Sequence, residues 1–127
     1  MSKVVLDASA LLTVLNGEPG AERVIQALPG SVISAVNLAE VATKLQGRGV
    51  PDDRIRAIIE ALELTVAPLD GDLAIDTGLL RAGTRSAGLS LGDRACLALA
   101  GSLRATALTT DRNWQSLDIG VAIELAR

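Results

Sequence analysis

The sequence predicts an α/β fold, a sandwich of helices around a central, mainly parallel sheet of about five short strands. Short apolar runs typical of buried strands alternate with helical patterns along the whole 127-residue chain. No internal repeat, linker-like stretch or low-complexity segment interrupts this alternation. With 49% hydrophobic and 21% charged residues, the composition is that of a globular protein with a substantial core. We therefore expect a single domain.

The predicted strands are short apolar runs bounded by glycine, proline or aspartate. The first is the run KVVL, and the later ones contain SVIS, LTVA, ATALT and IGVAI. In chain order these strands are predicted over residues 3–6, 31–34, 64–67, 105–109 and 119–123.

The predicted helices are marked by start and stop signals. Pro19 suits the first position of the second helix, and Gly49 and Pro51 end the third. Asp70 and Ser90 suit the starts of the fifth and sixth. In chain order the helices are predicted over residues 8–16, 19–28, 35–48, 51–62, 70–86 and 90–104.

Charge and composition restrict the function classes. The net charge of −3 argues against binding nucleic acid through a broadly basic surface, and a single Trp without Phe or Tyr provides no base-stacking platform. That objection weakens if the excess acid surrounds a metal ion. No apolar run approaches the ~20 residues of a membrane span. The lone Cys96 cannot form an internal disulfide, so we expect a reducing, cytoplasmic location.

Four acidic residues end or interrupt apolar runs: Asp7, Glu40, Asp93 and Asp111. An ionised carboxylate is costly to desolvate there unless a partner offsets the cost, and a cluster around a hard divalent cation would do so. The chain has no histidine and one cysteine, which leaves oxygen atoms as almost the only metal ligands. Asp7 and Asp111 follow predicted strands, at the sheet edge where α/β proteins bind ligands.

Each acid also has an ordinary structural explanation. Asp7 and Asp111 suit a helix cap or a turn. Asp93 can form a capping box with Ser90, and Glu40 can pair with the lysine four residues later. No single acid is therefore decisive, and the prediction of a site rests on the four together.

Taken together, the four segments resemble a PIN domain, most closely a VapC-type toxin ribonuclease of VapBC toxin–antitoxin pairs. The matching motifs are D-x-S-x-L from Asp7, Glu40 in NLAEV, Asp93 in SLGDRACLALA, and TTDRNW around Asp111. They occur in order over essentially the whole chain. The resemblance implies a single PIN domain over residues 1–127, with three α/β/α layers.

The resemblance also implies a function: a Mg²⁺-dependent endoribonuclease, with Mn²⁺ able to substitute, that hydrolyses RNA phosphodiester bonds with metal-activated water. Relatives of this type form homodimers and are inhibited by a cognate VapB-type antitoxin. An apolar helical stripe could present a surface to either partner, although core packing is its default interpretation. The stripe comprises Leu11, Leu12, Leu15, Val24 and Ile25.

On this hypothesis the four acids are the catalytic and metal-binding residues, and Ser9 and Thr110 orient water. Arg94 and Arg112 directly follow two of the acids and could contact substrate phosphate, although surface or helix-turn arginines are as common. One position departs from the pattern: some relatives carry a further acid where this chain has Asn113, which leaves the number of metal ions open.

Three alternatives compete with this hypothesis. A PIN scaffold whose nuclease site is silent would bind RNA or protein without cleaving it. A receiver-like phosphoacceptor domain suits the length and the parallel sheet, but such a domain expects adjacent acids after the first strand, where this chain has Asp7 followed by Ala8. A haloacid-dehalogenase-type phosphatase expects D-x-D, whereas position 9 is Ser.

Overall fold

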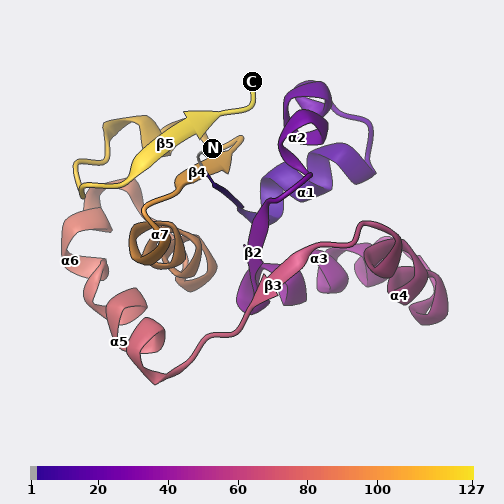
Figure 1. Cartoon of the computed structure of the whole chain (residues 1–127), viewed down its shortest axis with the longest axis horizontal. Helices are drawn as coiled ribbons and strands as arrows, with labels where there is room; N and C mark the ends of the chain where they lie inside the picture. The colour runs from indigo at the N-terminus through magenta and orange to yellow at the C-terminus, as the bar shows by residue number, and fades with distance from the viewer. Residues whose placement is uncertain (1–2) are drawn as a thin grey trace.

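The computed structural model describes residues 3–127 as a five-stranded, fully parallel sheet flanked by helices (Figure 1). The order of strands across the sheet is β3-β2-β1-β4-β5. The prediction of an α/β fold with a parallel sheet is confirmed. The strands are β1 (Val4–Leu6), β2 (Val32–Ser34), β3 (Thr65–Ala67), β4 (Thr106–Thr109) and β5 (Ala122–Leu125).

The helices follow the predicted order, with one helix divided. They are α1 (Ala8–Leu15), α2 (Ala21–Ala27), α3 (Ala35–Gly47), α4 (Asp52–Ala61), α5 (Gly71–Leu79), α6 (Arg81–Thr84) and α7 (Leu91–Leu103), with 3-10 turns η1 (Arg85–Ala87) and η2 (Arg112–Ser116).

Three predicted boundaries were wrong. The helix predicted over 70–86 is divided into α5, α6 and η1, because Gly78 and Gly83 are weak helix formers and the Thr77 hydroxyl bonds back to the Leu73 carbonyl. Helix α2 starts two residues after Pro19, because Gly20 caps it with a φ of 97°. Strand β5 starts later than predicted, after a turn at Gly120, where φ is 75°.

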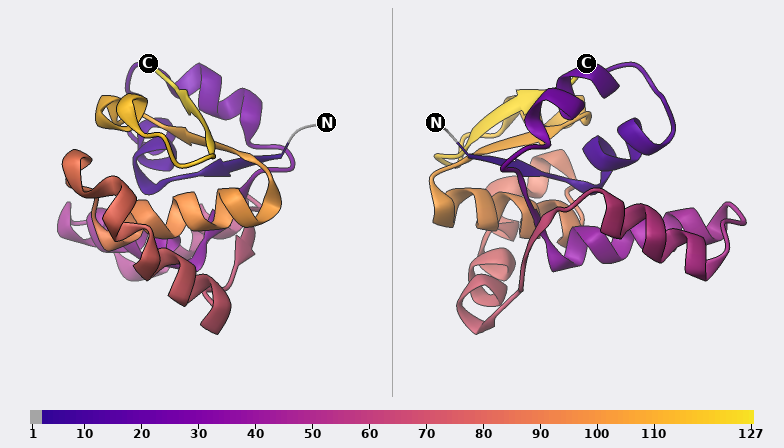
Figure 2. Two further views of the ribbon diagram at one scale, coloured as in Figure 1. Left: turned by 90° about the vertical axis from the view of Figure 1, so that its left-hand side faces the viewer. Right: turned by 45° about the vertical axis from the view of Figure 1, so that its right-hand side comes forward.

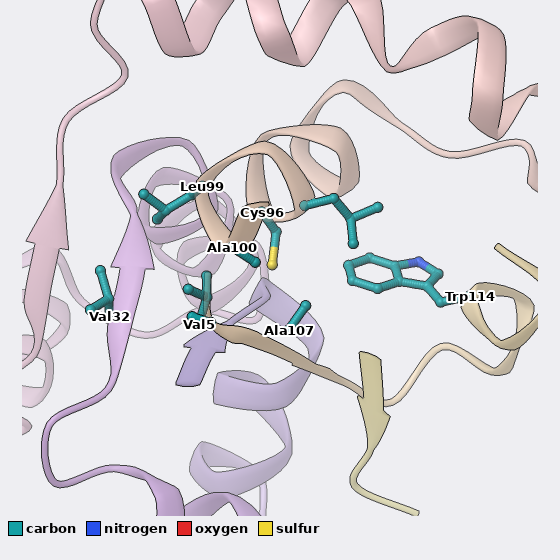
Figure 3. Packing of buried hydrophobic residues seen from close by; sticks show 9 residues of the cluster. Val5, Val32, Cys96, Leu99, Ala100, Ala107 and Trp114 are labelled. Atoms are coloured by element: carbon teal, nitrogen blue, oxygen red, sulfur yellow. The ribbon is translucent and has the colours of Figure 1, made fainter. Parts of the chain in front are cut away.

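Alternate strand residues pack on opposite faces of the sheet, which gives three layers. Val5, Val32 and Ala107 share a buried cluster with α7, whereas Leu6 and Leu108 pack with residues of α1 and α2 (Figure 2). Figure 3 shows the first cluster, in which the Trp114 ring points toward Cys96 and Ala107. Trp114 is fully buried, as a core residue.

Most of the apolar stripe proposed for a partner belongs to this core. Leu11, Leu12 and Val24 are buried, so they cannot form a docking surface, whereas Ile25 is half exposed. Within residues 3–127, no helix is both long and apolar enough to cross a membrane.

The strand order places a crevice at the carboxyl end of β1. From β1 the chain builds outward through β2 and β3, then returns to the other side of β1 to add β4 and β5. At such a reversal, the connections that leave two neighbouring strands diverge and leave room for a ligand. Asp7 directly follows β1, and Asp111 follows β4 by two residues.

Candidate active site at the carboxyl end of the sheet

Asp7 is the buried centre of the candidate site. Its carboxylate caps α1 by accepting a 2.8 Å bond from the Ala10 amide, and it accepts the Ser9 hydroxyl at 2.7 and 2.9 Å. A third donor comes from β4: the Thr109 hydroxyl lies 2.6 Å from Oδ2 of Asp7. The side chain is only 3% exposed. The predicted capping role is therefore present, together with a burial that capping does not require.

Burial controls the protonation of this carboxyl. Desolvation raises the pKa of Asp7 to about 6, against the lowering effect of the hydrogen bonds from Thr109, Ala10 and Ser9. The negative charge of Asp93 raises the pKa further. A positive charge in the crevice would therefore favour the ionised form strongly.

Asp93 and Asp111 line the same pocket as Asp7, a hollow of about 280 Å³. Asp93 completes the predicted capping box, in which its Oδ2 accepts the Ser90 amide at 3.0 Å. Oδ1 of Asp111 accepts the Asn113 amide at 2.9 Å and caps η2. Each cap uses one carboxylate oxygen, which leaves the other oxygen of Asp93 and of Asp111 for another partner.

Glu40 reaches the same region from α3. Its Oε1 accepts a 2.8 Å bond from Asn37, and among the described residues it has no ion pair with Lys44. Burial raises the pKa of the Cys96 thiol well above its usual value, and the charges of Asp7, Asp93 and Glu40 add to this effect. Glu40 does not line the pocket itself; its carboxylate lies beside Gly92, the residue before Asp93.

The acids are gathered but not arranged as a finished metal cage. Within residues 3–127, no three acidic, cysteine or histidine side chains already have the geometry to hold one ion. In this arrangement Asp93 and Asp111 each direct one carboxylate oxygen to a backbone amide.

The supporting residues fall into two groups. Ser9 bonds to Asp7 and also accepts the Thr110 amide at 3.2 Å. Thr110 lines the pocket, but the hydroxyl that contacts Asp7 belongs to Thr109, which was not predicted as a site residue. The parallel register, which pairs Leu6 with Leu108, brings Asp7 beside Thr109. Asn113 is exposed and contributes only its backbone amide.

Neither predicted arginine lines the pocket. Arg94 is 9% exposed and donates to the carbonyls of Thr77 and Gly78 at 3.2 and 3.4 Å, so its expected phosphate contact is wrong in this structure. The physical reason is that these carbonyls end α5, where a cation is favourable. Arg112 is exposed on η2 and lies outside the pocket wall.

Other cations line the pocket instead: Lys44 of α3, Arg48 at the C-cap of α3, and Arg127. The guanidinium of Arg127 also donates to the Pro19 carbonyl at 3.1 Å. The sequence did contain a signal for the first two, because Glu40, Lys44 and Arg48 are spaced four apart and share one helix face. Basic residues near the end of a helix are also a common stop signal, which explains both residues without a functional role.

Comparisons with known proteins agree with this fold. The family model described as "PIN domain" matches residues 4–120. No curated protein sequence matches the chain significantly.

Solved structures match over nearly the whole chain. A DNA-bound VapBC from Salmonella typhimurium is 25% identical, with a TM-score of 0.77 and full coverage of both chains. A toxin–antitoxin complex from Klebsiella pneumoniae is 20% identical over 98% of each chain, with a TM-score of 0.76. VapC20 of Mycobacterium tuberculosis, described as a sarcin–ricin-loop-cleaving toxin, is 16% identical over 89% of this chain and 93% of its own, with a TM-score of 0.72. With a family model that matches residues 4–120, the chain belongs to the PIN domain family, and it shares the fold of these solved toxin and toxin–antitoxin structures.

Proposed function

We propose that this protein is a Mg²⁺-dependent endoribonuclease and the toxin of a toxin–antitoxin pair. The observation that carries the proposal is the buried Asp7 carboxylate, which shares a pocket with Asp93 and Asp111 at the carboxyl end of the sheet. The relationship to VapC-type proteins supports it, since one such protein is described as a toxin that cleaves an RNA loop.

The residues present fit a hard divalent cation. All four acids offer carboxylate oxygens, the donors that Mg²⁺ prefers, and ionised Asp7 is costly to bury without a neighbouring positive charge. Asp7, Asp93 and Asp111 would hold the ion, with Glu40 beside them. When bound, Mg²⁺, or Mn²⁺ in its place, lowers the pKa of a water molecule and stabilises charge on phosphoryl oxygens.

The chain's own residues orient Asp7, attract the substrate phosphate and provide a base. The Ser9 hydroxyl of α1 and the Thr109 hydroxyl of β4 both donate to the Asp7 carboxylate. Together they hold it in one orientation. Lys44, Arg48 and Arg127 supply positive charge on the pocket wall, which would offset the repulsion between the acids and an RNA phosphate. With no histidine in the chain, a carboxylate is the available side-chain base.

Cleavage of RNA by the wild type and by Asp7→Asn tests the proposal. We expect Mg²⁺-dependent cleavage that leaves 5′-phosphate ends, abolished by EDTA and reduced at least about 100-fold in Asp7→Asn. Asp118→Asn, which removes an exposed carboxylate, is the matched control and should keep full activity. Equal activity of wild type and Asp7→Asn, or full activity in excess EDTA, would refute the mechanism.

A VapB-type antitoxin is the proposed protein partner. Several solved relatives are toxin–antitoxin complexes, some of them bound to DNA. We expect the product of a small reading frame next to this gene to co-purify with the chain and to suppress its ribonuclease activity. Unchanged cleavage in the presence of that product would contradict the pairing.

We also propose a homodimer. Ile75 and Leu79, one turn apart on α5, are 61% and 72% exposed, and Leu91 at the start of α7 is also exposed. Apolar side chains of this size are typical of interface cores. Light scattering should give twice the monomer mass for the wild type and a smaller mass for Leu79→Asp; a monomeric wild type at high micromolar concentration would contradict the proposal.

The alternative is a PIN scaffold that binds without cleaving. The helix-capping bonds of Asp93 and Asp111, which give both acids a structural role, favour it. A Mn²⁺ titration discriminates, because a silent scaffold should bind the ion no better than Asp7→Asn does.

A further inference from the structure

We propose that Asn37 is a positioning residue, which fixes the Glu40 carboxylate beside the first turn of α7 in a slot that exists because residue 92 is glycine. The inference rests on the proposed function, since it gives that site a residue beyond its four acids. Two independent observations carry it: the bonding of the Asn37 amide, and the space around Gly92.

The Asn37 amide connects two helices. The side chain is 1% exposed, and its Nδ2 donates to Oε1 of Glu40 at 2.8 Å and to the Gly92 carbonyl at 3.0 Å. Because both partners are acceptors, only this orientation of the amide gives two bonds; the flipped amide would place oxygen against oxygen. Asn37 therefore holds α3, α7 and the carboxylate in one arrangement.

The other end of the same amide is unsatisfied. Oδ1 of Asn37 is buried and has no hydrogen-bond partner among the described residues. Its neighbours along this face of α3, Val41 and Leu45, are buried and apolar. An apolar side chain at position 37 would avoid burying an unpaired acceptor, so packing alone does not favour Asn here. The bond that Asn37 donates to Glu40 offsets this unfavourable burial by fixing the position of the Glu40 carboxylate.

The glycine provides the space that Glu40 occupies. A β-carbon at position 92 would lie 2.5 Å from Cδ of Glu40 and 2.7 Å from its Oε2, closer than such atoms approach. The carboxylate therefore fills the volume that any other residue at 92 would take. This volume adjoins the positive end of α7, which favours an anion.

Together the amide and the glycine restrict a flexible side chain. A free Glu on a helix samples several rotamers, and each must be given up when the carboxylate engages an ion or a water molecule. Asn37 removes part of that freedom beforehand, which is the contribution of a supporting residue to a preorganised site.

Two variants displace Glu40 by different routes. Asn37→Leu has a similar branched shape without the donor and without the unpaired acceptor. Gly92→Ala adds the β-carbon, and the atom that must move is the end of the flexible Glu40 side chain, not backbone. Gln46→Leu is the matched control, because Gln46 is also an α3 amide that donates to a carboxylate, at 3.0 Å from Asp52, but outside the pocket.

The experiment measures Mn²⁺ affinity by electron paramagnetic resonance, urea midpoints from Trp114 fluorescence, and the kinetics of RNA cleavage. For Asn37→Leu and Gly92→Ala we expect Mn²⁺ affinity to fall about tenfold and kcat to fall. KM should stay within error of the wild-type value. The urea midpoint should stay within error or rise. Gln46→Leu should change none of the site measurements. In a Glu40→Gln background, Asn37→Leu should produce no further loss of Mn²⁺ affinity.

The outcomes separate this inference from the proposed function. Mn²⁺ affinity within twofold of wild type in both variants, or an equal loss with and without Glu40, would overturn the positioning role. A loss of affinity explained by a lower urea midpoint would show a structural role and would also overturn it. If the wild type binds Mn²⁺ but cleaves no RNA, the proposed function fails while the affinity data still decide the role of Asn37.

Discussion

Asp7 combines two opposing effects on one carboxylate. Three hydrogen-bond donors stabilise its ionised form, yet burial outweighs them and the pKa rises to about 6. A carboxylate that only capped α1 would remain solvated, and its hydrogen bonds would lower its pKa. The excess burial is a destabilising feature that a bound cation would relieve.

This balance predicts an unusual pH dependence of stability for the metal-free protein. The pKa of Asp7 is about 6 in the folded protein and about 3.8 when unfolded, so the folded state holds the proton more tightly. The contribution of Asp7 to the free energy of unfolding is therefore fully present below about pH 4 and is lost as the pH rises through about 6. The loss amounts to roughly 3 kcal/mol. Asp7→Asn, which cannot ionise, should become more stable than wild type between pH 4 and pH 7.

Urea unfolding in EDTA at pH 4 and pH 7.5, followed by the fluorescence of the buried Trp114, measures this difference. Asp118→Asn removes an exposed carboxylate and should show no such change with pH. A stability difference between Asp7→Asn and wild type that is the same at both pH values would contradict the raised pKa.

At the scale of elements, α3 and α7 supply the chemistry that surrounds Asp7. Helix α7 carries Asp93 in its first turn, and α3 presents Glu40, Lys44 and Arg48 on one face. The two helices meet at Asn37 and Gly92, so their contact determines how acids and cations share the pocket.

The cations of α3 are predicted to bind the RNA backbone. With Asp7→Asn as a non-cleaving background, Lys44→Ala with Arg48→Ala should weaken RNA binding and reduce the slope of log affinity against log salt by about 1.4. Fluorescence anisotropy of a labelled RNA at several salt concentrations measures both. Arg54→Ala with Arg56→Ala removes two charges from α4, outside this pocket, and should keep the wild-type slope; an equal effect of both pairs would contradict the prediction.

The two arginines that follow the acids should separate into a structural and a surface residue. Arg94→Ala leaves the Thr77 and Gly78 carbonyls without their partner and should destabilise the protein by about 2 kcal/mol, without altering the salt slope of RNA binding. Arg112→Ala, at an exposed position, should stay within about 0.5 kcal/mol of wild type. Urea unfolding compares them, and equal stabilities would contradict the assignment.

At the scale of the whole molecule, the site joins three distant parts of the chain. Asp7 follows β1, Asp93 begins α7 and Asp111 follows β4, so only the folded chain brings them to one pocket. Any ion that binds there binds the folded state in preference to the unfolded one.

Mg²⁺ should therefore raise the thermal stability of the wild type. At a free concentration 100-fold above its dissociation constant, the gain is about 2.7 kcal/mol. Asp7→Asn should gain much less, and Mg²⁺-free controls with added NaCl of equal ionic strength separate binding from screening. A wild-type melting temperature that is insensitive to Mg²⁺ would contradict the metal site.

The sequence by itself determined the alternation of strands and helices, the caps at Asp7, Asp93 and Asp111, and the order of the four acidic motifs. These are local properties, since they depend on apolar periodicity and on residues a few positions apart. The sequence did not predict the break within residues 70–86. Glycine and a threonine hydroxyl weaken a helix, but tertiary packing determines whether the helix then breaks.

The tertiary structure alone decided which hydroxyls and cations join the acids. Register across the parallel pair β1 and β4 places Thr109, not Thr110, against Asp7, and α5 draws Arg94 away from the pocket. The meeting of α3 with α7 gives Glu40 its place at Gly92 and brings Asn37 into the site. These contacts join residues from 16 to 102 positions apart, apart from the Asn37–Glu40 pair within α3, and no local pattern encodes such distances.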